Sequence, residues 1–227
     1  MKVYCVIPAY NEEKNIKKVI EDVKGKVDKI IIVDDCSFDK TYEISKRQNV
    51  VVLRHIVNRG QGAALQTGNT YALNDGADIM VHFDADGQFL VEEIKDLVEP
   101  ITQGEADIVF GSRFLEKKSD IPKFKKIIIL PLAKLVNKII LGVNLSDPQS
   151  GFRAMNSKAL KTIRIDNDGS AHCSEIIYKT FKSELKLKET PITVIYKDFG
   201  KSIFAGRGRG SSGLDIIKDL ILGKFIQ

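Results

Sequence analysis

The chain has 227 residues, of which 43% are hydrophobic and 29% are charged, and its formal charge is +5 at neutral pH. This composition is typical of a soluble globular protein, with either one large α/β domain or two small domains, and it argues against disorder. The three cysteines are far apart and odd in number, so they support neither a disulfide framework nor a zinc site and fit a reducing cytoplasm.

Five apolar, β-rich runs alternate with helical patterns in the first half of the chain. The predicted strands cover residues 2–7, 29–35, 50–55, 78–84 and 106–111, and the predicted helices cover residues 12–24, 39–48, 61–74 and 91–102. Repeated strand–helix–strand units whose strands are apolar on both sides indicate a mostly parallel sheet covered by helices on both faces. The predicted fold class is therefore α/β with a Rossmann-like sheet.

Polar, charged and glycine residues follow the end of every predicted strand in this half. These segments are residues 8–13, 34–37, 58–62, 84–88 and 111–114. The carboxyl ends of parallel strands lie at one edge of a sheet, and ligands bind in the crevice beyond that edge. The pattern predicts a functional site there.

The second half of the chain is less regular. Residues 123–143 predict one or two amphipathic helices divided at Pro131, and residues 147–155 predict a turn that leads into a short strand. A helix over 174–185, a strand over 189–196, a flexible basic loop over 206–213 and an amphipathic helix over 214–226 complete the prediction. Since no repeat or linker interrupts the chain, we expect a single domain over residues 1–227.

Two carboxylates, Asp84 and Asp86, stand at the end of the fourth predicted strand. If the extended geometry continues through Ala85, both point the same way and repel each other unless a cation or a shared proton lies between them. Mg²⁺ or Mn²⁺ bound by carboxylates and substrate phosphates satisfies this condition, and Gln88 adds an oxygen donor. A plain turn is the alternative. A phosphatase nucleophile is disfavoured, because Gln88 replaces the Thr or Val expected after the glycine and the motif lies on the fourth strand.

The second predicted strand ends in the same way, with Asp34 and Asp35. One of these carboxylates can bond a ribose or a base, while the other can cap the loop into the next helix.

Six motifs occur together in a fixed order, and they resemble a known family. They are "VIPAYNEEKNI" (6–16), "IIVDDCSFDKT" (31–41), "NRGQGAALQTG" (58–68), "FDADGQF" (83–89), "VFGSRF" (109–114) and "DPQSGFRAM" (147–155). The chain is similar to family 2 glycosyltransferases of the GT-A fold, in the branch of the dolichol-phosphate mannosyltransferases and polyprenyl-phosphate glycosyltransferases. The resemblance covers about residues 1–200 and implies inverting transfer from a nucleotide sugar such as GDP-mannose or a UDP-hexose, with Mg²⁺ or Mn²⁺.

The resemblance also implies roles for individual residues. Residues 1–115 would form the nucleotide-sugar-binding half, and residues 116–227 the acceptor-side half. The nucleotide-sugar pocket would include Pro8, Tyr10, Glu12, Asp35, Asp84, Ala85, Asp86 and Arg113, and the metal would be held by Asp84, Asp86 and Gln88. Arg153 would lie near the sugar or the acceptor. The acceptor side would include Lys125, His172, Glu175, Lys197 and Ser202. For His172 a structural role is the alternative.

The acceptor stays open between a polyprenyl phosphate and a saccharide hydroxyl. A phosphate is already an anionic nucleophile at neutral pH, whereas a hydroxyl needs a general base, for which Asp147 is the candidate. An Asp-Pro turn is the alternative role for Asp147.

The chain departs from dolichol-phosphate mannosyltransferases at Ile203, where those enzymes tend to carry a lysine. Processive synthases are disfavoured, because their "QxxRW" motif cannot exist in a chain without Trp.

The excess basic charge gathers in residues 117–138 and 197–209. In residues 123–143, lysines beside apolar residues predict a helix that lies in a membrane interface, and packing of this helix on the domain core is the alternative. No signal peptide and no run of ~20 apolar residues is expected, so the predicted location is the cytoplasmic membrane face, with peripheral attachment. The helix over 214–226 predicts a second interfacial element or a homodimer contact.

Nucleic-acid binding is not expected, because the "GRGRG" tract lacks interleaved aromatic residues. A sugar-nucleotide-binding protein without catalysis is a further alternative.

Overall fold

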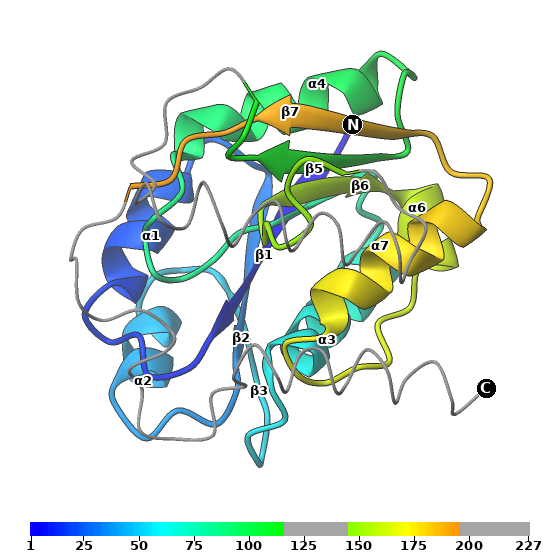
Figure 1. Ribbon diagram of the computed structural model, residues 1–227. Coiled ribbons are helices and arrows are strands. Elements are labelled where there is room, and N and C mark those ends of the chain that lie inside the picture. Colours follow the sequence, from blue (N-terminus) through cyan, green and yellow to red (C-terminus); the bar gives the residue numbers. More distant parts are fainter. Residues whose placement is uncertain (116–144, 196–227) are drawn as a thin grey trace, which may run out of the picture.

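A computed structural model describes residues 1–115 and 145–195. These residues form one seven-stranded sheet with helices packed on both of its faces (Figure 1). In chain order the elements are β1 (Val3–Ala9), α1 (Ile16–Val23), β2 (Lys29–Asp34), α2 (Thr41–Lys46), β3 (Val51–Arg54), α3 (Gln61–Asn74), β4 (Ile79–His82), the 3-10 turn η1 (Val91–Glu93), α4 (Ile94–Thr102), β5 (Ile108–Ser112), β6 (Arg153–Asn156), α6 (Ser157–Thr162), α7 (His172–Lys182) and β7 (Leu187–Pro191).

The strand order explains how the two halves of the chain meet. The order is β3-β2-β1-β4-β6-β5-β7, and every pairing is parallel except those of β6 with β4 and β5. Because β6 runs in the opposite direction, its first residue lies where its neighbours end. Arg153 therefore pairs with His82 of β4 and with Phe110 of β5. The antiparallel insertion brings residues 147–153 to the carboxyl edge of the parallel strands.

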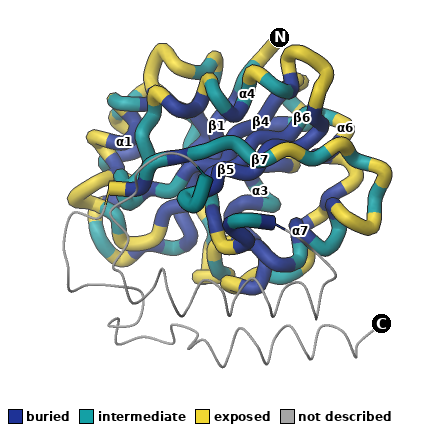
Figure 2. Tube along the Cα trace, turned by 45° about the horizontal axis from the view of Figure 1, so that its top comes forward, coloured by how far each residue is buried: buried dark blue, intermediate teal, exposed yellow. Residues whose placement is uncertain are grey.

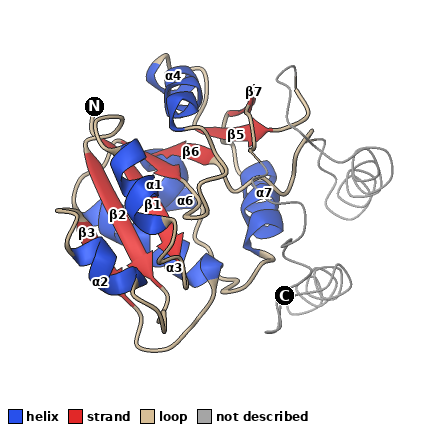
Figure 3. Cartoon of the chain, turned by 90° about the vertical axis from the view of Figure 1, so that its left-hand side faces the viewer, coloured by secondary structure: helices blue, strands red, loops and turns tan. Residues whose placement is uncertain are grey.

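Alternating side chains of the central strands fill two apolar layers, one on each face of the sheet. In β1, Cys5 and Ile7 belong to the layer that includes residues of α1 and α4, whereas Tyr4 and Val6 belong to the layer of α3, α6 and α7. The side chains of a strand point alternately to its two faces, so a strand buried on both faces is apolar throughout. Figure 2 shows the buried residues along these central strands, and Figure 3 shows the helices around them.

The five strands predicted in the first half are confirmed, with bounds that differ by one to two residues at most ends. The first helix begins at Ile16 and not at residue 12, because Asn11 has a positive φ of 56° and residues 12–15 form a turn. The predicted strand over 189–196 overlaps β7, which begins two residues earlier, at Leu187, and ends at Pro191. Beyond it, the Ile192 N–H donates to the Ser112 carbonyl at 2.9 Å, and Val194 forms an isolated bridge with Phe89.

Two further elements differ from the sequence prediction. The predicted helix over 174–185 begins at His172 and ends at Lys182. The short helix α6 was not predicted. It begins after Asn156, whose side-chain oxygen accepts a hydrogen bond of 2.8 Å from the Ala159 N–H and so caps the first turn. The segments 123–143, 206–213 and 214–226 lie outside the described residues. No helix in the described part of the chain is long and apolar enough to span a membrane.

Candidate active site

The loops after β1 and β2 bind each other at the carboxyl edge. The backbone N–H of Asn11 donates to the Ser37 hydroxyl at 2.9 Å, and the Phe38 N–H donates to the Asn11 side-chain oxygen at 2.9 Å. Tyr10, which directly follows β1, meets the Phe38 ring edge-on with centroids 6.2 Å apart, and both rings are exposed. Pro8 lies buried within β1. Of the predicted site residues of this motif, Pro8 therefore lies in the strand, while Tyr10 and Glu12 stand on a loop that is fixed by side-chain hydrogen bonds.

The carboxylate of Asp35 holds the loop that follows β3. It is buried and accepts hydrogen bonds from the Arg59 N–H at 2.9 Å and the Gly60 N–H at 2.6 Å, and it also pairs with His55 Nδ1 at 2.7 Å. These contacts occupy both oxygens of Asp35, which was predicted on the base or ribose side. Its neighbour Asp34 is buried within reach of Arg54 Nε at 3.1 Å.

The acidic segment after β4 is a turn and not an extension of the strand. β4 ends at His82, the Ala85–Asp86 pair forms a turn, and Gly87 has a φ of 69°. The extended geometry assumed through Ala85 is therefore wrong. Asp86 Oδ1 accepts the Gln88 N–H at 3.0 Å, and Asp84 Oδ1 accepts from Gln61 Nε2 at 3.0 Å.

The electrostatics of this turn fit a divalent cation. Burial and, next, the Asp86 carboxylate raise the pKa of Asp84 to about 7. Burial also raises the pKa of Glu12, and the charge of Asp86 adds to that rise, so the first motif lies close to the acidic turn. Carboxylate and amide oxygens are the ligands that Mg²⁺ and Mn²⁺ accept. In the described residues no group of three or more His, Cys, Asp and Glu side chains could hold a metal ion. A divalent cation at this turn would therefore need further ligands, such as substrate phosphates.

Gly151 lies directly against Asp84. A Cβ atom on Gly151 would stand 2.7 Å from Asp84 Oδ2, which is closer than real Cβ contacts. The next residue, Phe152, packs edge-on against Phe83 with centroids 5.2 Å apart and stacks on Phe89 at 5.0 Å. Phe83 precedes the acidic turn and Phe89 follows it, so both contacts hold Phe152 against this turn. The absence of a side chain at Gly151 leaves room for the Asp84 carboxylate.

Arg113 and Asp147 form a bidentate ion pair. Arg113 Nε lies 2.6 Å from Asp147 Oδ2, and Nη2 lies 2.7 Å from Oδ1, while the Arg113 N–H adds a third bond of 3.1 Å. Glu189 of β7 supports this pair, because its carboxylate accepts from the Ser146 N–H at 2.9 Å and the Asp147 N–H at 3.3 Å. Two predicted site residues are thus brought together, and their pairing was not foreseen.

Arg153 and His172 lie in one buried group. Arg153 Nη2 donates to the Ser150 carbonyl at 3.0 Å and to Cys173 Sγ at 3.2 Å. His172, the first residue of α7, places Nε2 3.4 Å from the same sulfur. The structure thus brings a predicted catalytic residue and a predicted acceptor residue together through a cysteine that the sequence analysis did not single out.

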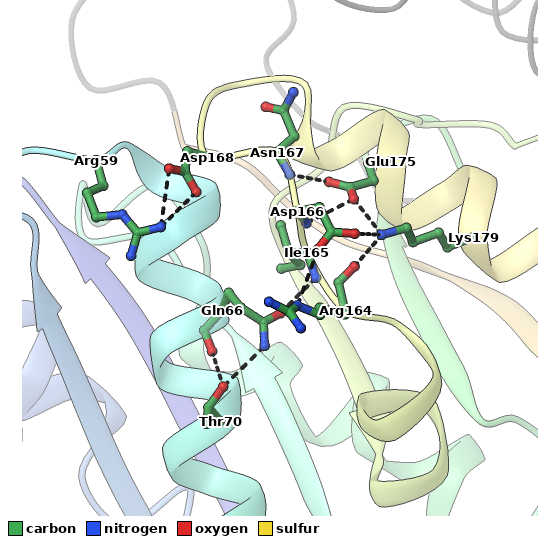
Figure 4. Close-up of polar contacts among 10 residues, drawn as sticks. All are labelled: Arg59, Gln66, Thr70, Arg164, Ile165, Asp166, Asn167, Asp168, Glu175 and Lys179. Carbon is green, nitrogen blue, oxygen red and sulfur yellow. Dashed lines mark hydrogen bonds and ion pairs between the residues drawn. The ribbon is translucent and has the colours of Figure 1, made fainter. Parts of the chain in front are cut away.

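Glu175 faces the loop before α7, not the buried group. Figure 4 shows its carboxylate at the N–H groups of Asp166 and Asn167, at 2.9 and 2.8 Å, and at Lys179 Nζ, at 2.6 Å. The same loop reaches the segment just before α3, where Arg59 pairs with Asp168 at 3.3 Å. Glu175 therefore orders a loop in this structure.

Lys125, Lys197 and Ser202 lie outside the described residues. Within the described part, sequence reasoning missed Gln61, His55, Cys173 and Glu189 as partners of the predicted residues. The motif "NRGQG" already contained Gln61, so its position beside the acidic turn could have been found from the strand-end rule. Glu189 and Cys173 carry no local pattern that would have revealed them.

The profile of the family described as "Glycosyl transferase family 2" matches residues 4–164. An uncharacterized protein of Methanocaldococcus jannaschii is 38% identical over 232 residues, which cover 99% of this chain and 93% of that protein. A Methanococcus voltae protein named UDP-N-acetylglucosamine–dolichyl-phosphate N-acetylglucosaminyltransferase is 36% identical over 219 residues, which cover 87% of each chain.

Among solved structures, glucosyl-3-phosphoglycerate synthase from Mycobacterium tuberculosis, in complex with Mn²⁺, UDP and glucosyl-3-phosphoglycerate, superposes with a TM-score of 0.68. The sequences are 22% identical, and the match covers 87% of this chain and 72% of that chain. At this level of identity the likeness supports the fold, which is the predicted GT-A fold.

Proposed function

This chain belongs to glycosyltransferase family 2, and we propose that it is an inverting, metal-dependent enzyme that moves a sugar from a nucleoside-diphosphate sugar to a polyprenyl or dolichyl phosphate. The observation that carries the proposal is the contact between Asp84 and Gly151. This contact brings the acidic turn next to the segment that contains Arg153. The acidic turn could hold a metal ion at the donor diphosphate, and the Arg153 guanidinium could bind an anionic acceptor.

The donor would lie at the carboxyl edge between the β1 loop and the acidic turn. A Mg²⁺ or Mn²⁺ ion held by Asp84, Asp86, Gln88 and the diphosphate would neutralise the charge that develops on the leaving nucleoside diphosphate. Tyr10 offers an exposed ring at this edge, and Glu12 lies close enough to Asp86 to sense its charge. The M. voltae relative is named for UDP-N-acetylglucosamine, and the M. tuberculosis enzyme was solved with Mn²⁺ and UDP, so a UDP-hexose is the first donor to test and GDP-mannose the second.

The ion pair of Asp147 with Arg113 favours a phosphate acceptor over a hydroxyl acceptor. Both oxygens of the carboxylate are engaged by Arg113, so Asp147 would have to leave this pair before it could take a proton from a hydroxyl. A phosphate acceptor needs no such base, because its oxygen is already anionic at neutral pH. Direct attack of that oxygen on the anomeric carbon, opposite the leaving diphosphate, would invert the configuration.

A lipid phosphate as acceptor would place the enzyme at a membrane surface while it works. The name of the M. voltae relative, which includes dolichyl phosphate, supports this reading. The predicted interfacial helices and the acceptor residues Lys125, Lys197 and Ser202 remain predictions.

The proposal is tested by product analysis. Purified protein is incubated with UDP- and GDP-sugars, Mn²⁺ or Mg²⁺, and either a short polyprenyl phosphate or a panel of saccharides, and the products are identified by mass spectrometry. The proposal predicts a glycosylated polyprenyl phosphate that disappears when the metal is chelated. Transfer to saccharide hydroxyls alone, or nucleotide-sugar binding without any transfer, would overturn it.

A further inference from the structure

The Cys173 side chain lies within hydrogen-bond distance of a fully buried arginine. Arg153 is 0% exposed, and its Nη2 lies 3.2 Å from Cys173 Sγ, although the two residues are 20 positions apart and belong to β6 and α7. Cys173 itself is 8% exposed. A guanidinium has only donors and always carries its charge, so the sulfur is the acceptor in this contact.

The remaining contacts of Arg153 are with neutral oxygens. Nη2 also donates to the Ser150 carbonyl at 3.0 Å, and Nε donates to the Gly151 carbonyl at 3.3 Å. Within the described ranges 1–115 and 145–195, Nη1 is buried and has no hydrogen-bond partner. A buried charge is strongly destabilising unless it is paired. Among the hydrogen-bond partners of Arg153 in the described part of the chain, only Cys173 can become an anion.

His172 places a ring nitrogen next to the sulfur. Its Nδ1 lies 2.9 Å from the Gly169 carbonyl, which can only accept, so Nδ1 carries a proton. Its Nε2 lies 3.4 Å from Cys173 Sγ, where a second ring proton would face the sulfur. The Arg153 guanidinium and a His172 ring that is protonated on both nitrogens would each favour the deprotonated form of the sulfur.

The electrostatics agree with this geometry. Burial alone would raise the pKa of the Cys173 thiol, but the His172 imidazolium and the Arg153 guanidinium lower it to about 6. Burial lowers the pKa of His172, but the charge and hydrogen bond of Cys173 and the hydrogen bond of the Gly169 carbonyl together raise it, so its net shift is upward. Two other titratable groups face this cluster. His82 of β4 is held neutral by burial, which lowers its pKa, and Asp84 carries the raised pKa described above.

Cys5 provides an internal contrast. It is fully buried in the apolar layer with α1, and burial raises the pKa of its thiol far above the usual value. Burial therefore does not produce a thiolate in this fold. The difference between the two cysteines comes from Arg153 and His172.

We propose that Cys173 is a thiolate in the folded enzyme and acts as a positioning residue, holding the Arg153 guanidinium so that Nη1 is available to an anionic group of the substrate. Cys173 does not react. It fixes the orientation of Arg153 and balances its charge while the site is empty. The part of the proposal that concerns the substrate depends on the proposed function, whereas the thiolate itself does not.

The ionisation is measured first, without substrate. The ultraviolet absorbance of a thiolate is followed against pH in the wild-type protein and in Cys173→Ala, with Cys5→Ala as the matched control. We expect the wild-type minus Cys173→Ala difference to show a thiolate at neutral pH with a midpoint near the value of about 6. The Cys5→Ala protein should show the same titration as the wild type. No thiolate at neutral pH in the difference spectrum would overturn the proposal. Should Cys173→Ala fail to fold, NMR of the Cβ signals in isotope-labelled wild-type protein gives the same titration.

The positioning role is measured by kinetics. Cys173→Ser removes the charge and keeps the size, and we expect kcat to fall by about tenfold or more, as for a misplaced catalytic group, with donor affinity unchanged. Cys173→Asp restores an anion and should recover part of the loss. Below about pH 6 the wild-type rate should fall toward that of Cys173→Ser, as the thiolate takes up a proton. Equal kcat values and equal pH profiles for the wild type and Cys173→Ser would contradict the positioning role. Absence of transfer by the wild type would instead count against the proposed function.

Discussion

Gly151 and Asp84 are in contact across the junction of β4 and β6, and a Cβ at position 151 would stand 2.7 Å from Asp84 Oδ2. The two residues are 67 positions apart in a chain of 227 residues. Since their contact depends on a missing side chain, the identity of residue 151 controls the position of the carboxylate.

Gly151→Ala should therefore displace the Asp84 carboxylate and weaken metal-dependent nucleotide binding. We expect the Kd of a nucleoside diphosphate in Mn²⁺ to rise by about tenfold, which corresponds to about 1.4 kcal/mol. Calorimetric titration measures this. Gly169→Ala is the matched control, because its Cβ would meet only Asn167 Oδ1 at 3.6 Å, which is an ordinary contact. Unchanged nucleotide affinity in Gly151→Ala would show that the acidic turn tolerates the methyl group.

Asp84 should make the stability of the metal-free protein depend on pH. Its folded-state pKa of about 7 lies above the ordinary value of 3.8, so between these values the folded protein binds more protons at this site than the unfolded chain does. Stability contributed by the protonated form is then lost as the pH rises through about 7. Asp84→Asn removes this titration.

The corresponding measurement is thermal unfolding in chelator. The Tm of Asp84→Asn relative to wild type should increase from about pH 5 to about pH 8, and added Mn²⁺ with nucleoside diphosphate should reverse the difference by stabilising only the wild type. Glu21→Gln, at an exposed position of α1, serves as the control. A Tm difference that does not change with pH would contradict the raised pKa of Asp84.

Asp147→Asn should affect stability more than chemistry. The substitution leaves Arg113, whose side chain is 21% exposed, without its bidentate anion, and this should destabilise the protein by about 1–3 kcal/mol. Because a phosphate acceptor needs no base, kcat with polyprenyl phosphate should stay within about tenfold of wild type, which is below the range typical for loss of a general base. Chemical denaturation and initial rates provide the two numbers. A larger loss of kcat with substrate binding intact would assign the base role to Asp147 and favour a hydroxyl acceptor.

Glu175→Gln should loosen the loop before α7. Its carboxylate accepts from two loop N–H groups and from Lys179, so we expect a loss of about 1–3 kcal/mol of stability. The KM for the acceptor should stay unchanged, because the contacts of Glu175 are structural. Glu184→Gln, at an exposed position, is the control. A selective rise in acceptor KM with normal stability would return Glu175 to the acceptor site predicted from the sequence.

The periodicity of the sequence was sufficient to predict the parallel part of the sheet. β1 to β5 are apolar on both faces, and each is followed by polar residues, so their order along the chain already indicated an edge with Asp84 and Asp86. The position of Arg153 could not be predicted in this way, because it depends on the antiparallel insertion of β6 between β4 and β5. Long-range pairing of this kind leaves no local pattern.

Side-chain partnerships were equally hidden from the sequence. The pairing of Arg113 with Asp147 spans 34 positions and depends on where β5 and the residue 145–147 segment meet. The ionisation of Cys173 depends on two cations that the fold brings to it. At Ala85–Asp86 the local geometry itself was not predicted. The sequence analysis considered an extended backbone through Ala85, whereas the strand ends at His82 and a turn follows. Periodicity predicts the elements, whereas charge states follow from tertiary contacts.

The most direct test of the account compares the wild type with Asp86→Asn in the transfer of sugar to polyprenyl phosphate, at saturating donor and Mn²⁺. Removing a charge that holds the metal at the leaving diphosphate should lower the rate by about a hundredfold or more, the range found when one transition-state contact is lost. Circular dichroism and the Tm control for folding. Rates within about threefold of each other, with both proteins folded, would contradict the assignment of the acidic turn to the metal and the donor diphosphate.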